Sequence, residues 1–328
     1  MISSIFYAIA KATMSQPNPL EHAMDLAINA ATQFLGSTAP NPPVGAILLD
    51  KNGTVLCGAG HEKAGSLHAE AKALDVAKKL GRLDQAHTLV VTLEPCNHSG
   101  RTLPCVDAIL KTKIKRVVAG ARDPNPKVAG GGIERLRKAG VEVITGIREK
   151  ECKELIRGFR KQSTTGLPWV TIKQAFTREE SMIPPPGLKT FTSDKSLRFA
   201  HELRRRADAI WTGSGTVLAD SPEFTVRLVQ DFPNKKRILM LSDRRGQIST
   251  DWKNARISQG FSLMNATDFL SGLEALGEHG ALEVLVEAGP TLTEAFLDSG
   301  LWDEHVVIMQ GEEGEDDRVE IIEKGELN

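Results

Sequence analysis

The sequence has little cysteine, few aromatic residues and no long apolar run, and each shortage excludes a class of protein. Four cysteines in 328 residues, Cys57, Cys96, Cys105 and Cys152, are too few for a disulfide framework, which indicates a reducing compartment and predicts a cytoplasmic location. No apolar run approaches the length of about 18 residues that a membrane span needs. A single tyrosine and a formal net charge of −1 argue against a nucleic-acid or membrane-surface partner.

The sequence does contain an alternation of helix and strand patterns. In the first half, apolar residues 44–50 and 54–60 flank the turn Lys-Asn-Gly at 51–53, which predicts a β-hairpin. Strands that alternate with helices predict an α/β sheet with mostly parallel pairing. The other predicted elements of this half are helices over 20–36, 68–81, 106–112 and 132–140, and strands over 87–93, 114–120 and 141–146.

A second set of elements follows residues 158–168, so we predict two domains, 19–155 and 156–328. Residues 1–18 have a short apolar patch with no basic segment before it, which favours a loose leader over a signal peptide, and Met14 is an alternative start. The last 18 residues carry eight acids and two bases, which predicts an exposed or frayed tail. The predicted elements of the second half are helices over 193–206 and 291–300, and strands over 169–176, 208–213, 237–243 and 282–288.

Three separated motifs form a pattern that packing alone explains poorly: His68-x-Glu70, Pro95-Cys96 and Pro104-Cys105. One imidazole and two thiolates are a typical catalytic zinc set with a fourth position left for water, whose pKa the metal lowers. Glu70 beside that water can pass a proton to a leaving nitrogen. Each cysteine alone fits a small buried apolar residue, and His68 alone fits a helix cap. Together with both prolines, the motifs match the signature of the zinc nucleobase deaminases.

The wide spacing of the two cysteines makes the resemblance more specific. Eight residues, Asn-His-Ser-Gly-Arg-Thr-Leu-Pro, separate Cys96 from Cys105, where most zinc deaminases have two. The stretch "TLEPCNHSGRTLPC" (92–105) closely resembles a motif of the riboflavin-biosynthesis deaminase–reductases. "APNPPVG" (39–45), "HAE" (68–70) and "DPNPKVAGGG" (123–132) resemble three further motifs of that family.

The resemblance implies a cytidine-deaminase-like three-layer domain followed by a dihydrofolate-reductase-like α/β domain. It also implies zinc-dependent deamination of a diaminopyrimidinone that carries a ribosylamino 5-phosphate, with Glu70 as proton shuttle. Asn41 is a candidate for holding the pyrimidine edge, because an amide both donates and accepts hydrogen bonds, and equally a turn residue before proline. The remaining deaminase substrate candidates, each with a plain loop or turn role as the alternative, are His98, Arg101, Thr102, Asp123 and Asn125.

The second half resembles the reductase domain of the same family, and the resemblance implies NADPH as reductant. "TGSGTVLADSPEFTVR" (212–227) and "VEAGPTL" (286–292) are similar to two family signatures, and Lys173 matches a catalytic lysine near the reacting centre. A basic helix end around Arg204 and a turn at Asp220 also fit plain structural roles. The matching positions are Arg204, Arg227 and Glu287 for substrate, and Thr216, Asp220 and Gly289 for cofactor.

The reductase half also departs from its family, within a divergent loop over 176–192 and at the C-terminal end. Residues 176–182 lack the usual Asp-Gly pair, a triple proline follows at 184–186, and Thr190 stands where the family commonly has an aromatic. The tail replaces a strand that usually bears Leu-Leu-Gly. An alternative is therefore a deaminase with a degenerate, non-catalytic reductase domain.

A third reading belongs to another class, either a nucleic-acid deaminase or a non-catalytic nucleotide-binding module. The near-zero charge and the phosphosugar-type loop count against nucleic acid, and a binding module predicts no stoichiometric zinc. The resemblance itself implies a phosphoribosyl pyrimidine as small-molecule partner and a homo-oligomer.

Overall fold

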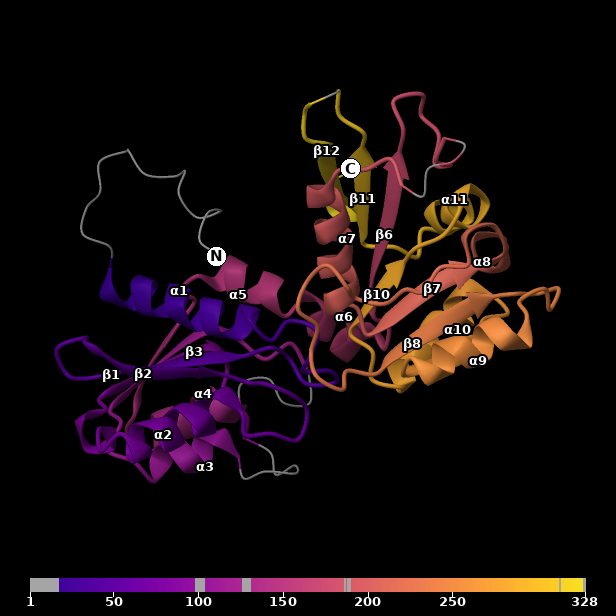
Figure 1. Ribbon diagram of the computed structural model, residues 1–328. Helices are drawn as coiled ribbons and strands as arrows, with labels where there is room; N and C mark the ends of the chain where they lie inside the picture. Colours follow the sequence, from indigo (N-terminus) through magenta and orange to yellow (C-terminus); the bar gives the residue numbers. More distant parts are fainter. Residues whose placement is uncertain are drawn as a thin grey trace.

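A computed structural model describes residues 18–97, 104–125, 131–185, 187, 190–312 and 314–326 of the chain. The first half forms a five-stranded sheet in the order β2-β1-β3-β4-β5, with helices on both faces, so this half has three layers (Figure 1). Helices α1 and α5 lie on one face, and α2, α3 and α4 lie on the other. The bounds are α1 Pro19–Thr32, β1 Gly45–Leu49, β2 Val55–Gly60, α2 Ala69–Lys79, β3 Thr88–Leu93, α3 Cys105–Leu110, β4 Arg116–Ala121, α4 Gly131–Lys138, β5 Glu142–Thr145 and α5 Glu149–Leu155.

The strand pairings of this sheet follow from the sequence patterns. The predicted hairpin is confirmed, because β1 pairs antiparallel with β2, and β1 also pairs antiparallel with β3. Strands β3, β4 and β5 are parallel. Every residue of β3 (Thr88–Leu93) is buried, as expected for a central strand covered on both faces. The carboxyl ends of β3 and β4 therefore meet at one edge, where the Pro95-Cys96 loop and Asp123 begin.

The second half forms a seven-stranded sheet in the order β12-β11-β6-β10-β7-β8-β9. All of its pairings are parallel except that of β12 with β11. Among the described residues, no helix combines the length and the apolar character needed to cross a membrane. The bounds are α6 Arg157–Thr165, β6 Trp169–Phe176, α7 Asp194–Arg206, β7 Ala209–Gly213, α8 Ser214–Asp220, β8 Arg237–Ser242, α9 Thr250–Ser258, β9 Phe261–Asn265, α10 Phe269–Glu278, β10 Glu283–Val286, α11 Pro290–Ser299, β11 Glu304–Met309 and β12 Arg318–Glu323.

The sequence predicts an exposed or frayed C-terminal tail, and over β12 the tail is largely exposed but forms a strand instead of fraying. This strand pairs antiparallel with β11, placing Val319 opposite Ile308 and Ile321 opposite Val306. Val319 and Ile321 lie on the same face as the buried Ile308 and Val306 of β11, but both are exposed at the edge of the sheet. The acids of the tail obscured this strand, because Glu320 and Glu323 stand among its apolar residues and further acids precede it in the loop.

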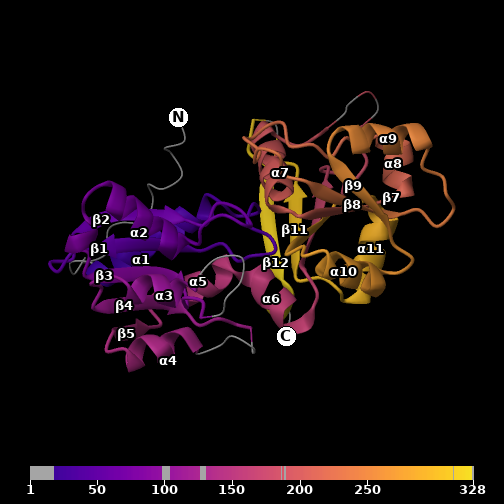
Figure 2. The same ribbon diagram turned by 90° about the horizontal axis from the view of Figure 1, so that it is seen from below.

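Helices α5 and α6 occupy the predicted boundary, where the sequence indicated no element. The boundary between residues 155 and 156 coincides with the break between these two helices. Figure 2 shows α6 between the two sheets. Arg157 opens α6 and is buried, with Nη1 2.7 Å from Oε2 of Glu304 on β11. Helix α6 thus belongs to the contact between the two halves.

A second contact joins the end of α7 to the loop after α1. The Arg205 side chain donates from Nη2 to the Gln33 carbonyl oxygen at 3.1 Å. Gly36 has φ +88°, and a Cβ atom there would collide with the backbone of Arg206. Only glycine allows both that backbone conformation and that close approach without strain. The loop that leads to Asn41 is therefore packed directly against the second half of the chain.

Candidate active sites

Three elements of the first half bring one histidine and two cysteines together. His68 is the residue before α2, Cys96 lies in the loop after β3, and Cys105 is the first residue of α3. The Nδ1 atom of His68 lies 3.6 Å from Sγ of Cys96 and 3.3 Å from Sγ of Cys105. All three ligand atoms lie within 4.8 Å of one another. The predicted ligand set is thus assembled from segments far apart in the sequence.

The donor set fits a zinc ion on chemical grounds. Cys105 donates a hydrogen bond to Cys96, which lowers the pKa of Cys96 to about 4, while the same contact and burial raise the pKa of Cys105. The hydrogen bond with Cys96 raises the pKa of His68. A set of two soft thiolates and one imidazole is typical of catalytic zinc. Metal binding displaces the thiol proton, so Cys105 can also bind as a thiolate.

Glu94 fixes the loop that carries Cys96 through hydrogen bonds to the start of α4, a role that the sequence did not reveal. Glu94 is 4% exposed, and its Oε1 accepts hydrogen bonds from the backbone N–H groups of Gly132 at 3.1 Å and Ile133 at 3.2 Å. These groups belong to the first turn of α4, where a carboxylate is favoured by the helix dipole. A Cβ atom on Gly132 would collide with the Pro95 carbonyl oxygen. This packing fixes the backbone immediately before Cys96.

Glu70 lies in the first turn of α2 and shares a cavity of about 470 Å³ with His68 and Cys96. Its side chain is buried, and burial together with the negative charge of Cys96 raises its pKa to about 7. A carboxyl group with a pKa in this range can both accept and release a proton near neutral pH. Residues two positions apart inside a helix point to different faces. His68 precedes α2 and Glu70 lies in its first turn, so both side chains can face one cavity.

Predicted substrate residues also line this cavity, together with His61, which the sequence analysis missed. Asn41 Nδ2 lies 3.2 Å from His61 Nε2, and His61 Nδ1 lies 3.1 Å from the Leu67 carbonyl oxygen. A carbonyl oxygen only accepts, so Nδ1 carries the proton and Nε2 accepts from the Asn41 amide nitrogen. Burial lowers the pKa of His61, which favours this neutral form. The side-chain oxygen of Asn41, Oδ1, is then available to accept a hydrogen bond from a ligand.

The outcome for the other predicted deaminase residues differs by segment. Asp123 and Asn125 line the same cavity at the end of β4. Phe159 of α6 also lines it, which the sequence did not indicate because Phe159 follows the predicted domain boundary. The predicted residues His98, Arg101 and Thr102 lie outside the described residues.

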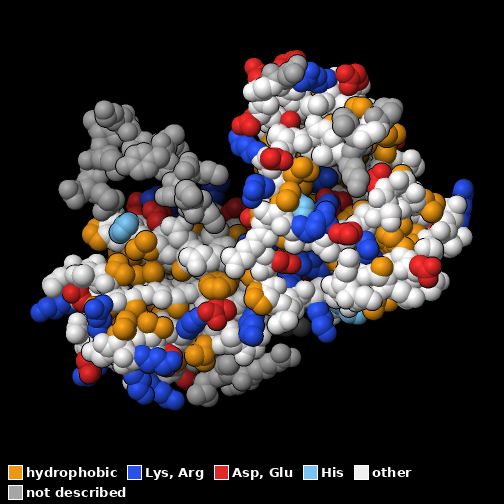
Figure 3. All heavy atoms as spheres, viewed as in Figure 1, with side chains coloured by type: hydrophobic (Ala, Val, Ile, Leu, Met, Phe, Trp, Pro, Cys, Tyr) orange, Lys and Arg blue, Asp and Glu red, His pale blue; other side chains and the backbone are white. Residues whose placement is uncertain are grey.

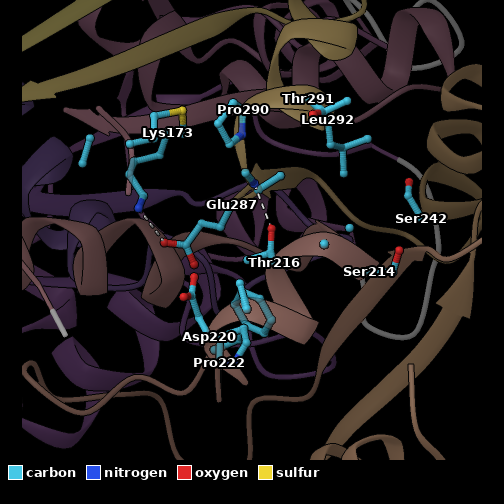
Figure 4. A pocket seen from close by; sticks show the side chains of 18 of the residues that line it. Lys173, Ser214, Thr216, Asp220, Pro222, Ser242, Glu287, Pro290, Thr291 and Leu292 are labelled. Carbon is cyan, nitrogen blue, oxygen red and sulfur yellow. Dashed lines mark hydrogen bonds and ion pairs between the residues drawn. The ribbon is translucent and has the colours of Figure 1, made fainter. Parts of the chain in front are cut away.

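A second cavity of about 870 Å³ lies at the carboxyl ends of β6, β7, β8 and β10 in the second half. Glu287 is buried in the lining of this cavity, and Lys173 Nζ lies 3.3 Å from its Oε1 (Figure 4). Arg204 Nε lies 2.6 Å from its Oε2. Burial alone would raise the pKa of Glu287, but Arg204 and Lys173 outweigh it and lower the pKa to about 2. Three predicted residues thus form one charged group facing the cavity.

Of the predicted cofactor residues, Thr216 lies on the side of Glu287 away from Lys173 (Figure 4). The Thr216 hydroxyl accepts a hydrogen bond from the Gly289 backbone N–H at 2.8 Å, just before α11 begins at Pro290. Thr216, Asp220 and Gly289 all line the cavity. Arg244 and Arg245, after β8, line it as well, although the sequence analysis did not select them.

Arg227 is placed differently from the other predicted reductase residues. It is not among the residues that line the cavity, and its Nη1 lies 2.7 Å from Oε2 of Glu223. Its substrate-binding part stays a prediction.

Comparison with known proteins agrees with both halves. Residues 17–121 match the cytidine and deoxycytidylate deaminase zinc-binding region, and residues 184–311 match the RibD C-terminal domain. The chain is 37% identical over 313 residues to riboflavin biosynthesis protein RibD of Aquifex aeolicus, covering 87% of this chain and 85% of the relative. It is 34% identical over 320 residues to the Escherichia coli RibD protein, covering 88% and 86%.

The chain belongs to the RibD family of riboflavin biosynthesis proteins. Solved structures agree with this placement. Acinetobacter baumannii RibD superposes with a TM-score of 0.78 at 33% identity, covering 89% of this chain and 86% of that one. A Thermotoga maritima deaminase/reductase gives a TM-score of 0.79 at 34% identity, covering 91% and 88%. The predicted fold class is confirmed, and this RibD-family chain is an enzyme of riboflavin biosynthesis with deaminase and reductase domains.

The divergent loop of this RibD-family chain keeps a turn despite its missing Asp-Gly pair. The Thr177 N–H donates to the Ser181 carbonyl oxygen at 2.8 Å, and Glu180 adopts φ +59°. This left-handed conformation favours glycine, so the loop retains its turn at the cost of backbone strain. Thr190 lines the second cavity, and the aromatic residue Phe191 lines it one position later.

Proposed function

We propose that this enzyme catalyses two successive steps on one phosphoribosylated pyrimidine. The first is hydrolytic deamination of a diaminohydroxyphosphoribosylaminopyrimidine, and the second is NADPH-dependent reduction of the ribosyl group of the aminouracil product. The Thermotoga maritima relative is named as a deaminase and reductase of these compounds. The observation that carries the proposal is the convergence of His68, Cys96 and Cys105 beside buried Glu70.

In the deamination, His68, Cys96 and Cys105 would hold a zinc ion, which supplies a Lewis acid that makes water acidic near neutral pH. Glu70 accepts the proton of the attacking water on a carboxylate oxygen and passes it to the leaving amino nitrogen. One water is consumed, one ammonia leaves and a carbonyl replaces the amino group. Asn41 orients the pyrimidine through the oxygen that His61 leaves available.

Glu70→Gln tests this step, because glutamine keeps the size of the side chain and cannot carry the proton. We expect stoichiometric zinc with ammonia release lowered at least about a hundredfold, the lower range for a lost acid–base group. Glu62→Gln, at a half-exposed carboxylate near the same helix, is the matched control and should retain activity. Zinc content is read by metal analysis. Full ammonia release by Glu70→Gln would exclude its proton-shuttle part.

In the reduction, NADPH supplies a hydride when bound. The backbone of Gly289, Thr216 and the start of α11 support binding of its phosphates at a helix N-terminus. Arg244 and Arg245 make no ion pair or side-chain hydrogen bond with the described part of the chain, so they can pair with the extra phosphate of NADPH. Lys173, held beside Glu287, can provide the proton that balances the hydride.

The second candidate function is deamination alone, with the reductase domain as a scaffold. It is favoured by the strained turn at Glu180 and by the position of Arg227 outside the cavity lining. The two candidate functions are distinguished by supplying the deaminated aminouracil phosphate and following NADPH oxidation. Intact ammonia release without NADPH oxidation would leave the deaminase alone.

The cofactor preference has its own test in the double variant Arg244→Ala/Arg245→Ala. We expect a higher KM for NADPH and an unchanged KM for NADH, because only NADPH carries the extra phosphate. Arg318→Ala, at an exposed arginine on β12, is the control. An equal loss with both cofactors would exclude phosphate recognition by these two arginines.

The proposal includes a cytoplasmic homo-oligomer that acts on this small molecule and binds neither nucleic acid nor membrane. All four cysteines are free, as suits a reducing compartment. On the face drawn in Figure 3, basic side chains are interspersed with acidic ones, so no broad basic surface is offered to nucleic acid. Size-exclusion chromatography with light scattering tests the oligomer, and a preparation without stoichiometric zinc would instead favour a binding module.

A further inference from the structure

His201 of α7 is a buried histidine on the wall of the second cavity that no step above uses. It is 5% exposed, and its Nδ1 lies 2.9 Å from the Arg227 backbone nitrogen and 3.5 Å from that of Leu228. A backbone N–H only donates, so Nδ1 is an acceptor and carries no proton. The remaining proton of the neutral ring must therefore sit on Nε2.

The surroundings keep this ring neutral at neutral pH. Burial lowers the pKa of His201 to about 4, and the positive charges of Arg204 and Arg227 act in the same direction. Nε2 has no hydrogen-bond partner within the residues that the structure describes, while the ring lines the cavity. Nε2 is not among the fully buried side-chain atoms that lack a partner, so it is open to the cavity, where a ligand or water can accept its hydrogen bond.

The Nδ1 contact holds a strained loop. Between α8 and β8, Ser221 has φ +43° and the bulky Phe224 has φ +58°, although neither is glycine. Such conformations persist when surrounding contacts over-determine them, and they gather at functional sites. One face of α7 provides these contacts. Arg198 donates to the Leu228 carbonyl oxygen at 2.9 Å, and Arg204 donates to the Thr225 carbonyl oxygen at 3.4 Å.

We propose that His201 binds the reductase substrate, donating a hydrogen bond from Nε2–H to an oxygen of its phosphoribosyl group while Nδ1 holds the 221–228 loop against α7. This inference rests on the proposed reduction. The phosphoribosyl group is favoured over the pyrimidine because the cations Arg204 and Lys173 line the cavity together with His201, and together they outnumber the one carboxylate, Glu287, to which they are paired. Thr216, a predicted cofactor residue bonded to the Gly289 backbone N–H, lies on the side of Glu287 away from Lys173 (Figure 4).

Two variants separate the two contacts of the ring. His201→Asn keeps an acceptor near the Nδ1 position and loses the Nε2 donor, whereas His201→Gln keeps a donor near Nε2 and loses the acceptor. We expect His201→Asn to raise KM for the aminouracil phosphate about fivefold to tenfold, as for one lost hydrogen bond, with KM for NADPH unchanged. We expect His201→Gln to keep the substrate KM near that of the wild type and to be cleaved faster by trypsin at Arg227. Ammonia release is the internal control for folding.

Three kinetic results, and one independent of activity, would overturn the inference. An unchanged substrate KM in His201→Asn would exclude the donor, and equal KM changes in both variants would leave only the loop contact. A change confined to NADPH would assign the oxygen to the cofactor. The tautomer is read independently of activity by nitrogen NMR of labelled histidine, and a proton on Nδ1 contradicts the geometry. If the wild type oxidises no NADPH, the proposed reduction fails, and the same variants are compared through binding of ribose 5-phosphate.

Discussion

Arg157→Met should destabilise the protein far more than the loss of an ordinary ion pair. Arg157 and Glu304 form two hydrogen bonds, Nη1 to Oε2 at 2.7 Å and Nη2 to Oε1 at 3.2 Å, and each side chain is only 6% exposed. Thr171 also donates to Oε1 of Glu304 at 3.0 Å. Methionine fills much of the same volume but leaves the Glu304 carboxylate buried without its counter-charge.

The structure sets the expected magnitude. Leaving one member of a buried ion pair uncompensated costs about 3–5 kcal/mol. The double variant Arg157→Met/Glu304→Leu removes both charges of the pair, so it should recover most of the lost free energy of unfolding. Glu283 is not left without a counter-charge in this variant, because it remains paired with Arg206 at 3.1 Å. Arg116→Met provides the contrast, since the Arg116–Glu142 pair is 35% and 53% exposed and should contribute about 0–1 kcal/mol.

Urea unfolding, followed by circular dichroism, measures the free energy of unfolding for the three variants and the wild type. We also expect lower ammonia release from Arg157→Met, because Arg157 begins the helix whose Phe159 lines the deaminase cavity. A loss of less than about 1 kcal/mol for Arg157→Met would refute the reasoning from desolvation. So would a double variant as unstable as the single one.

Three further predictions concern single positions. Cys105→Ala should lose the bound metal, while Cys57→Ala, outside the cluster, should keep it; full zinc occupancy in the first would show that the ligand set is wrong. Glu180→Gly should raise the free energy of unfolding by about 1 kcal/mol by relieving its left-handed backbone, and an unchanged melting temperature would mean that no strain is present. Gly36→Ala should destabilise more than Gly140→Ala, because both have positive φ but only the first would strike a neighbouring backbone; equal losses in thermal melts would count against the packing argument.

Much of the deaminase site could be predicted because its chemistry demands rare residues next to prolines. The motifs at 68–70, 95–96 and 104–105 each mark one ligand, and the end of a parallel strand brings two of them to one edge. His61 gave no such signal, because a lone histidine in a loop is equally consistent with packing. Its part follows only from the distances to Asn41 and Leu67, which no sequence spacing reveals.

The fold was predictable where apolar periodicity was clear and was missed where charges are buried. The hairpin of β1 and β2 has a turn signal between two apolar runs, so its position follows from the sequence. Helix α6 begins with a buried arginine and a glycine. From the sequence, an arginine and a glycine at this position are expected to be exposed to solvent. Strand β12 carries its apolar residues among acids, which made an exposed tail the simpler expectation.

The place of Phe159 has a consequence for attempts to separate the two activities. A fragment that stops at Leu155 would contain every predicted zinc ligand and Glu70, yet it would lack one wall of the deaminase cavity. It would also expose the surface of the first half that now packs against α6, and the Gly36 backbone that now packs against the end of α7. The smallest useful deaminase fragment should therefore extend to Gly166, which caps α6, and should carry a replacement for the buried charge of Arg157.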